Sequence, residues 1–281
     1  MREPAPAQLL LENAHLRLRA CRYGPMLYNA RDRYVGGCLD TYGEFSEAEV
    51  DLFAQVLRPG MTALDVGANI GAHTLPMAQF VGPKGVVVAY EPQRIIFQTL
   101  CANLALGGME NVVAHWAAAT ARPGTVRVPR PDYSVPGNFG GVALHGDAAA
   151  TEEVAGLPVD SLDLVACHFI KVDVEGMEAE VLDGAAATIA RHRPLLYLEN
   201  DRAPGSQALL GRLLGWGYRC WWHLPPLVRA PNHAGEGANI FPGIVSVNVF
   251  AAPAESGASL GSPHEITSAD ARPPSLARWD A

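Results

Sequence analysis

The sequence predicts an α/β protein built on a mostly parallel sheet, and three observations support that prediction. Short apolar runs alternate with helical patterns through residues 51–250, which is the order of elements that parallel sheets produce. A glycine-containing turn, "DVGANIG", directly follows the first of these runs and precedes a helical pattern. The chain has 281 residues, 49% hydrophobic and 18% charged, which is enough apolar material for a sizeable core.

The individual elements follow from hydrophobic periodicity. The segment "HLRLRA" alternates apolar and basic residues, as a half-buried strand does. Ser46 lies three residues before Glu49, a capping-box spacing that predicts a helix over "FSEAEVDLFAQVL". The later strand candidates are "TALDV", "VVVAY", "VVAHW", "FIKVDV", "LLYLE", "YRCWWH" and "IVSVNVF". The helical patterns between them include "PQRIIFQTLCANLAL" and "MEAEVLDGAAATIARH".

Three zones divide the chain. Residues 1–45 are mixed in character and form an N-terminal extension or lid. Residues 46–251 carry the strand–helix alternation and form one α/β domain. Residues 252–281 are rich in Ala, Pro, Ser and Gly, a composition typical of a flexible C-terminal tail.

Charge and cysteine content exclude several classes of function. The formal net charge is −8 and no Lys/Arg cluster is present, so we expect no nucleic-acid partner. No apolar stretch approaches the roughly 20 residues of a membrane span, and the N-terminus lacks the pattern of a secretory signal. The five cysteines are far apart, without a C-x-x-C pair, which argues against zinc and disulfides. We therefore expect a cytoplasmic protein with buried thiols and no membrane partner. The oligomeric state is left open.

The glycine-containing turn is the first candidate site. A ligand at the carboxyl end of a strand, before a helix, is the default arrangement in an open α/β sheet. Gly67 and Gly71 let the backbone turn tightly and approach a ligand. The next predicted strand ends in Glu91, where a carboxylate can accept hydrogen bonds from two ribose hydroxyls. The turn and Glu91 together predict a nucleoside-containing cofactor.

The identity of that cofactor follows from the spacing. A dinucleotide site needs G-x-G-x-x-G, whereas here Gly67 and Gly71 are four residues apart. Asp65 would repel a pyrophosphate but would suit the positive charge of S-adenosylmethionine. Asn69 and the backbone N–H groups of the turn could bind the carboxylate of that cofactor.

Five segments of the chain together resemble a known protein family. The segments "LDVGANIGAHT", "PGNFGGVAL", "IKVDVEGMEAEVLDGAAATI", "RPLLYLEND" and "ANIFPGIVSVNVF" are similar to FkbM-type S-adenosylmethionine-dependent methyltransferases. The resemblance runs from about Tyr42 to Phe250. It implies a seven-stranded Rossmann-like sheet, mostly parallel with one antiparallel strand and with helices on both faces. It also implies methylation of a hydroxyl on a small molecule, natural product or sugar.

The resemblance also implies residue roles. The cofactor loop corresponds to Asp65, Gly67, Ala68, Asn69 and Gly71, and Glu91 corresponds to the ribose ligand. Ala117 and Ala118 fall where the adenine is usually bound, and with alanine there the contact is left to backbone groups. Tyr42 and Glu44, in a segment that closes over the cofactor in the family, are weaker candidates.

Charged residues at two strand ends are the candidates for chemistry. Lys171, Asp173 and Glu175 follow one another at a spacing of two, so an extended chain points them to one face. The next strand ends in Glu199, Asn200 and Asp201. If the two strands are neighbours, these groups share one cleft. Charged groups need such a cleft, or partners, because an apolar core does not accommodate them.

Three interpretations of these strand ends remain open. Asp173, with Glu175, Glu199 and Lys171 nearby, could act as a general base or steer the acceptor hydroxyl. Asp173, Glu199 and Asn200 could instead bind magnesium through oxygen ligands, as in catechol-type O-methyltransferases. The third interpretation is a structural network of ion pairs and a helix cap.

Other side chains are weaker candidates for the site. His223 closes a predicted strand and could be a base, although a histidine beside two tryptophans is more often a packing residue. The loop over residues 130–146 is long enough for a lid, and Phe139 or Trp222 could stack on a ring of the acceptor. An NAD-type oxidoreductase and a non-catalytic cofactor-binding module are the alternative functions.

Overall fold

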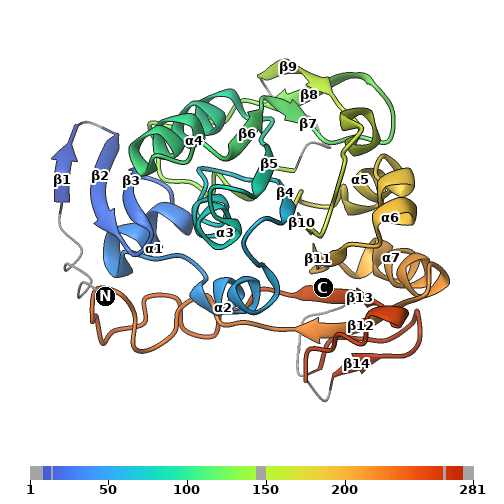
Figure 1. The fold of residues 1–281 in the computed structure, drawn as a ribbon. Coiled ribbons are helices and arrows are strands. Elements are labelled where there is room, and N and C mark those ends of the chain that lie inside the picture. The colour runs from blue at the N-terminus through green and yellow to red at the C-terminus, as the bar shows by residue number, and fades with distance from the viewer. Residues whose placement is uncertain (1–8, 14, 144–149, 262–263, 275–281) are drawn as a thin grey trace.

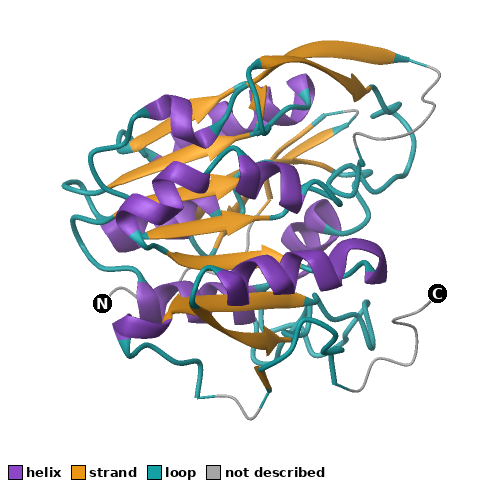
Figure 2. Cartoon of the chain, turned by 90° about the vertical axis from the view of Figure 1, so that its right-hand side faces the viewer, coloured by secondary structure: helices purple, strands orange, loops and turns teal. Residues whose placement is uncertain are grey.

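The main sheet has eight strands and forms the centre of the molecule. The computed structural model describes residues 9–13, 15–143, 150–261 and 264–274. Across the sheet the strands lie in the order β14 (Glu265–Ile266), β12 (Tyr218–His223), β13 (Asn248–Pro253), β11 (Leu195–Glu199), β10 (Phe169–Val172), β4 (Thr62–Val66), β5 (Val86–Tyr90) and β6 (Val112–His115). Figure 2 shows these strands stacked as one continuous layer behind helices.

The directions of the strands match the mostly parallel prediction, with two corrections. The strands β11, β10, β4, β5 and β6 pair in parallel. β13 lies antiparallel between β11 and β12, as expected of one strand, but β14 adds a second antiparallel strand on the outer edge of β12. The sheet therefore has eight strands rather than seven. A strand of two residues carries no periodic signal, which is why the sequence did not indicate it.

Helices cover both faces of this sheet. Figure 1 shows α5 (Glu178–Asp183), α6 (Ala186–His192) and α7 (Ala203–Gly215) on one side, with α2 (Glu47–Val56), α3 (Thr74–Val81) and α4 (Arg94–Gly107) on the other. Alternate residues of the central strands divide between two buried clusters. Leu64, Ile170 and Leu196 pack with α5–α7. Ala63, Phe169 and Tyr197 pack with α2 and α3. This division is the period of two expected of strands buried on both faces.

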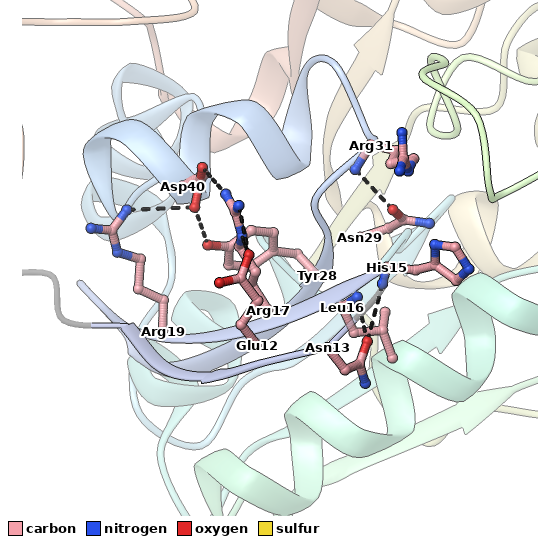
Figure 3. A network of polar contacts seen from close by, with 10 residues as sticks. All are labelled: Glu12, Asn13, His15, Leu16, Arg17, Arg19, Tyr28, Asn29, Arg31 and Asp40. Atoms are coloured by element: carbon pink, nitrogen blue, oxygen red, sulfur yellow. Dashed lines mark hydrogen bonds and ion pairs between the residues drawn. The ribbon is translucent and has the colours of Figure 1, made fainter.

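The N-terminal extension contains a second sheet. It contains β1 (Leu9–Glu12), β2 (Leu16–Cys21) and β3 (Gly24–Asn29), all antiparallel, and α1 (Val35–Tyr42) follows. Figure 3 shows how Asp40 of α1 ties it down. The Asp40 carboxylate accepts hydrogen bonds from Arg17 Nη1 and Tyr28 OH, both at 2.6 Å. Arg17 also pairs with Glu12, so the three strands and α1 form one unit.

A third, small sheet lies beyond β6. It contains β7 (Ala117–Ala118), β9 (Thr151–Gly156) and β8 (Gly124–Pro129), in that order. The single-turn helices η1 (Val159–Leu162) and η2 (Ala254–Ser256) complete the described elements.

Three local expectations are corrected by the structure. The helix predicted over residues 177–192 is two helices, α5 and α6, because Asp160 takes the hydrogen bonds at their junction: its N–H donates to the carbonyl oxygen of Gly184 at 2.8 Å, and its carboxylate accepts the N–H groups of Ala187 and Thr188. The Ser46 hydroxyl donates to Glu49 Oε1 at 2.6 Å and makes no bond to a helix N–H, so the capping box does not form. The C-terminal segment is not a loose tail throughout, because Ile266 is buried in the core. Residues 275–281 of that expected tail lie outside the described residues.

The described helices include none that is long and apolar enough to cross a bilayer. All five cysteines are unpaired; four are buried as expected, whereas Cys101 is exposed on α4.

Candidate functional site

A cavity of about 220 Å³ lies at the carboxyl ends of the parallel strands. Its wall includes most of the predicted cofactor residues and all four predicted catalytic residues, namely Gly67, Ala68, Asn69, Glu91, Ala117, Ala118, Lys171, Asp173, Glu175 and Glu199. These residues come from five strands and the turns that follow them. The residues selected from the strand–turn–helix pattern thus line one cavity, and their roles in it stay predictions.

The turn after β4 depends on Gly67. Its φ is +82°, a conformation that favours glycine, and an added Cβ would lie 1.8 Å from the carbonyl oxygen of Asp173. The backbones of the β4 and β10 ends are thus in direct contact. Asn69 is also left-handed, with φ +51°, and its side-chain oxygen accepts the N–H of Ile70 at 2.7 Å. Asparagine tolerates this conformation better than most residues.

Glu91 holds the same turn from the end of β5. Its two carboxylate oxygens accept the backbone N–H groups of Asn69, at 2.9 Å, and of Gln93, at 2.8 Å. Burial raises the pKa of Glu91 to about 7, against the lowering effect of those two hydrogen bonds. Because a carboxylate has about four acceptor positions, each oxygen keeps capacity for a further donor in the cavity.

Asp65 differs from the expectation. It is fully buried, and it does not line the cavity. Its Oδ2 accepts the Thr74 hydroxyl at 2.6 Å, and its Oδ1 accepts Lys171 Nζ at 3.2 Å. Asp65 therefore neutralises a protein cation instead of meeting a positive charge on a ligand. Gly71 also lies behind the wall, where a Cβ would press on Leu100 and Leu75.

Lys171 is brought to Asp65 by the sheet register. The two residues are direct partners on β10 and β4, and Tyr197 is the partner of Lys171 on β11. Lys171 Nζ also lies 3.5 Å from Asp173 Oδ2. Burial alone would lower the pKa of Lys171, but Asp65, Asp173 and Glu49 outweigh it and raise that pKa. The amine stays charged, so it supplies a fixed positive charge and cannot act as a base.

Three carboxylates gather at the ends of β10 and β11. One oxygen each of Asp173, Glu175 and Glu199 lies within 4.8 Å of the others, as the sequence predicted for neighbouring strand ends. Burial, followed by the charge of Asp173, raises the pKa of Glu175 to about 7 and that of Glu199 well above its usual range. Arg202 pairs with Glu175.

The remaining polar residues of the predicted cleft lie outside this group. Asn200 is buried and donates to Ser206 Oγ at 2.9 Å. Asp201 lies 3.9 Å from Arg202. Phe139 and Trp222 are both packed in the core, so neither is placed to stack on a ligand.

The loop over residues 130–143 covers one side of the cavity, while 144–146 of the predicted lid lie outside the described residues. Asn138, Gly140 and Gly141 line the wall. Gln93 anchors the loop by donating to the carbonyl oxygen of Phe139 at 2.8 Å and accepting the Tyr133 hydroxyl at 3.0 Å. The sequence analysis did not select Gln93.

Tyr42 and Glu44 support a different wall. The Tyr42 hydroxyl donates to the carbonyl oxygen of Ala238 at 2.9 Å and accepts the N–H of Ile240 at 2.7 Å. Glu44 accepts the N–H of His233 at 2.8 Å. Both hold the segment that follows β12, and Leu227, nearer to β12 in the same segment, lines the cavity.

Two further residues of the wall were missed as site residues. Glu49 was noted only for its capping spacing, and Tyr90 only as part of a strand. Neither could have been found from spacing, because tertiary packing brings them to the cavity.

A family profile described as the methyltransferase FkbM domain matches residues 65–220, more than half of the chain. The chain belongs to the FkbM methyltransferase family. It is 27% identical over 194 residues to the AMB antimetabolite synthetase AmbE of Pseudomonas aeruginosa, an alignment covering 54% of this chain and 9% of AmbE. The chain thus spans less than a tenth of that relative.

The chain is also similar to solved structures. One is an FkbM methyltransferase from Methylobacillus flagellatus, with 22% identity, coverage of 72% of this chain and 50% of the other, and a TM-score of 0.47. Another is TYW2 of M. jannaschii in complex with AdoMet, with 14% identity, coverage of 87% and 88%, and a TM-score of 0.46.

Proposed function

We propose that this FkbM family member uses S-adenosylmethionine to methylate a hydroxyl group of a small molecule, natural product or sugar. One observation carries the proposal. A single cavity is lined both by the glycine-containing turn and Glu91 and by the carboxylates of Asp173 and Glu199. The similarity of the chain to a segment of an antimetabolite synthetase supports a natural product as the methyl acceptor.

The cavity wall fits such a cofactor. Three buried polar atoms of residues that line it, His73 Nε2, Tyr90 OH and Glu199 Oε2, have no hydrogen-bond partner among the described residues. Leaving a buried polar atom without a hydrogen-bond partner costs free energy. A bound ligand could supply the missing donors or acceptors to these three atoms. Bound there, S-adenosylmethionine supplies an activated methyl group on a sulfonium sulfur.

The sheet order sets the direction of the cofactor in this proposal. Glu91 receives the ribose hydroxyls, and the backbone around Ala117 and Ala118, beyond β6, faces the adenine. The Asn69 side-chain amide is the group of the turn left for the amino-acid part, because the N–H groups of Gly67 and Ala68 donate to the Tyr90 carbonyl oxygen and that of Asn69 donates to Glu91. The sulfonium then lies near the ends of β4 and β10, so Asp173, Glu175 and Glu199 receive the acceptor.

Magnesium is a separate question for this site. The proximity of three carboxylates is the observation in its favour. However, Arg202 and Lys171 already bring positive charge to Glu175 and Asp173. We therefore leave the cation out of the proposal, and we expect methyl transfer to persist in EDTA.

Calorimetric titration with S-adenosylmethionine tests the cofactor assignment. The native protein is expected to bind, and Glu91→Ala is expected to weaken binding at least about tenfold, because hydrogen bonds to a charged group are worth about 1.5–3 kcal/mol. The matched control is Glu110→Ala, which changes an exposed glutamate. Tight binding of NAD without S-adenosylmethionine would instead revive the oxidoreductase, and binding of S-adenosylmethionine without transfer to any hydroxyl acceptor would favour a binding module.

A further inference from the structure

Glu49 is a buried carboxylate that the proposed function has not used. It lies on α2, is only 5% exposed and lines the cavity. Ser46 Oγ donates to its Oε1 at 2.6 Å, and Ser246, just before β13, is a second hydrogen-bond partner. Lys171 and Asp173 of the β10 end are its charged neighbours.

The sheet register brings Tyr197 to Glu49. Asp65, Lys171 and Tyr197 form one row across β4, β10 and β11. α2 packs over this row, with the Phe53 and Tyr197 rings 5.2 Å apart in an edge-to-face contact. Glu49 lies one helical turn before Phe53, on the same side of α2, and its carboxyl hydrogen-bonds to the Tyr197 phenol.

The Tyr197 phenol continues toward the outside. Its oxygen accepts a hydrogen bond from Asn248 Nδ2 at 2.8 Å and lies 2.8 Å from His223 Nδ1. Asn248 donates to the phenol oxygen and does not accept the phenol proton. The phenol can therefore donate that proton to Glu49 or to His223. His223 is only partly buried, whereas Tyr197 is 1% exposed. Glu49, Tyr197 and His223 thus form a hydrogen-bonded line from the cavity toward the surface.

We propose that Glu49 accepts the proton that the acceptor hydroxyl loses, and that Tyr197 and His223 carry it out of the cavity. This inference rests on the proposed function. The S–CH₃ bond breaks, an O–CH₃ bond forms, and the sulfonium becomes a neutral thioether. The released proton binds Glu49, Tyr197 passes its own proton to His223 Nδ1 while taking that of Glu49, and His223 releases one from Nε2.

The neighbours of the other carboxylates make them less suited to this role. Asp173 pairs with Lys171, and Glu175 pairs with Arg202, so protonating either would break an ion pair. The hydrogen-bond partners of Glu49 are neutral hydroxyl groups. Burial raises the pKa of Glu49, which makes its carboxylate a better proton acceptor near neutral pH.

The test compares two ligands that differ by one charge. S-adenosylmethionine carries the sulfonium, and S-adenosylhomocysteine is the neutral thioether without the methyl group. Titrating each into the protein in buffers of different ionisation enthalpy, from about pH 6 to about pH 9, counts the protons released on binding. A sulfonium beside Glu49 should expel up to about one more proton than the thioether does. Glu91 at the ribose contributes equally to both ligands.

The variants decide which group releases that proton. Glu49→Gln should bind both ligands and lose the extra proton. The matched control is Glu47→Gln, because Glu47 is also buried on α2 but pairs with Tyr23 and Arg22 outside the cavity wall. An extra proton that persists in Glu49→Gln, or is absent from the native protein, would overturn the inference. Failure of the native protein to bind S-adenosylmethionine would overturn the proposed function instead.

A second variant, Tyr197→Phe, tests the hydrogen-bonded connection to His223. It also tests the inference if Glu49→Gln does not fold. In Tyr197→Phe the extra release should move about one pH unit higher, because the carboxylate loses a hydrogen bond. In nitrogen-15 spectra of histidine-labelled protein, with His223→Gln to assign the signal, the His223 ring should respond to S-adenosylmethionine in the native protein and in Glu47→Gln. An equal response in Tyr197→Phe would show that the phenol does not connect Glu49 to His223.

Discussion

Individual residues of the cavity wall have environments that allow measurable predictions. Some of these residues have polar groups directed at the cavity, whereas others hold its wall in place. Gly67, Lys171, Asp173 and Glu91 illustrate the difference.

Gly67→Ala should disrupt the cofactor turn. Left-handed backbone alone costs an alanine roughly 1–2 kcal/mol, and here the Cβ would also collide with the Asp173 carbonyl. We expect the free energy of unfolding to fall by about 3 kcal/mol or more in urea titrations, and cofactor binding to be lost. Gly60→Ala is the control, since Gly60 has φ +89° with open space around it. Equal losses in both variants would contradict the close approach.

Lys171→Met should destabilise the protein strongly. It leaves Asp65 fully buried without its cation, and removing one partner of a buried ion pair typically costs about 3–5 kcal/mol. Adding Asp65→Asn to Lys171→Met should restore part of that loss. Urea unfolding of the single and double variants measures it, and a double variant as unstable as the single one would argue against the pairing.

Asp173→Asn should separate binding from transfer. Methyl transfer to an acceptor found by screening should fall about 100-fold or more, because the acceptor hydroxyl loses the carboxylate that positions it, while S-adenosylmethionine affinity changes less than about threefold. Asp163→Asn, at a 95%-exposed side chain, is the control. Retained transfer in Asp173→Asn would remove Asp173 from the acceptor end.

Glu91 makes cofactor affinity depend on pH. With its pKa raised to about 7 by burial, the carboxylate that accepts ribose hydroxyls is a minority form at pH 6 and the main form at pH 8. Affinity for S-adenosylhomocysteine should therefore rise about tenfold between those values. The same raised pKa means that the folded state binds more protons than the unfolded state between about pH 4.5 and 7, so this group's stabilising contribution falls as pH rises through that range. Glu91→Gln should abolish the slope in affinity and remove the contribution of this one group to the slope in stability.

At the scale of elements, the edge strand β14 is testable. Ile266 is 2% exposed and packs into the core from the C-terminal segment. Ile266→Ala should lower the free energy of unfolding by about 2–4 kcal/mol and leave cofactor affinity unchanged, because β14 lies at the far edge from β5. Ile240→Ala, at a half-exposed isoleucine, should change stability little. Similar effects of the two would mean that the C-terminal segment does not stabilise the sheet.

The elements also show what the sequence could predict. Long apolar strands and the amphipathic helices α2 and α4 were identified from period alone. The break at Gly184 was missed because Asp160, which is distant in sequence, takes the hydrogen bonds at the junction of α5 and α6. The strands β8, β9 and β14 were missed because half-exposed or very short strands lack a clear pattern.

For the whole molecule, the sequence indicated where the candidate residues gather. It did not indicate which side chains contact one another there. Charged residues after buried strands indicated the cleft, since parallel strands end at one edge. The pairing of Asp65 with Lys171 and the approach of Glu49 to Tyr197 depend on strand register and on how α2 packs, which no local pattern encodes. The family could be predicted from its resemblance to known sequences, whereas the side-chain contacts became known only from the strand register.

The position of β13 has a consequence for how the protein is made. β12 is synthesised first, yet its link to β11 is β13, which follows about 25 residues later along the chain and inserts between them. Ser246, directly before β13, is also part of the cavity wall. A nascent chain that lacks this last long strand has neither a joined sheet nor a complete cavity. The cavity wall is therefore completed only after synthesis has passed β13, and a ligand that needs the whole wall should bind late in synthesis.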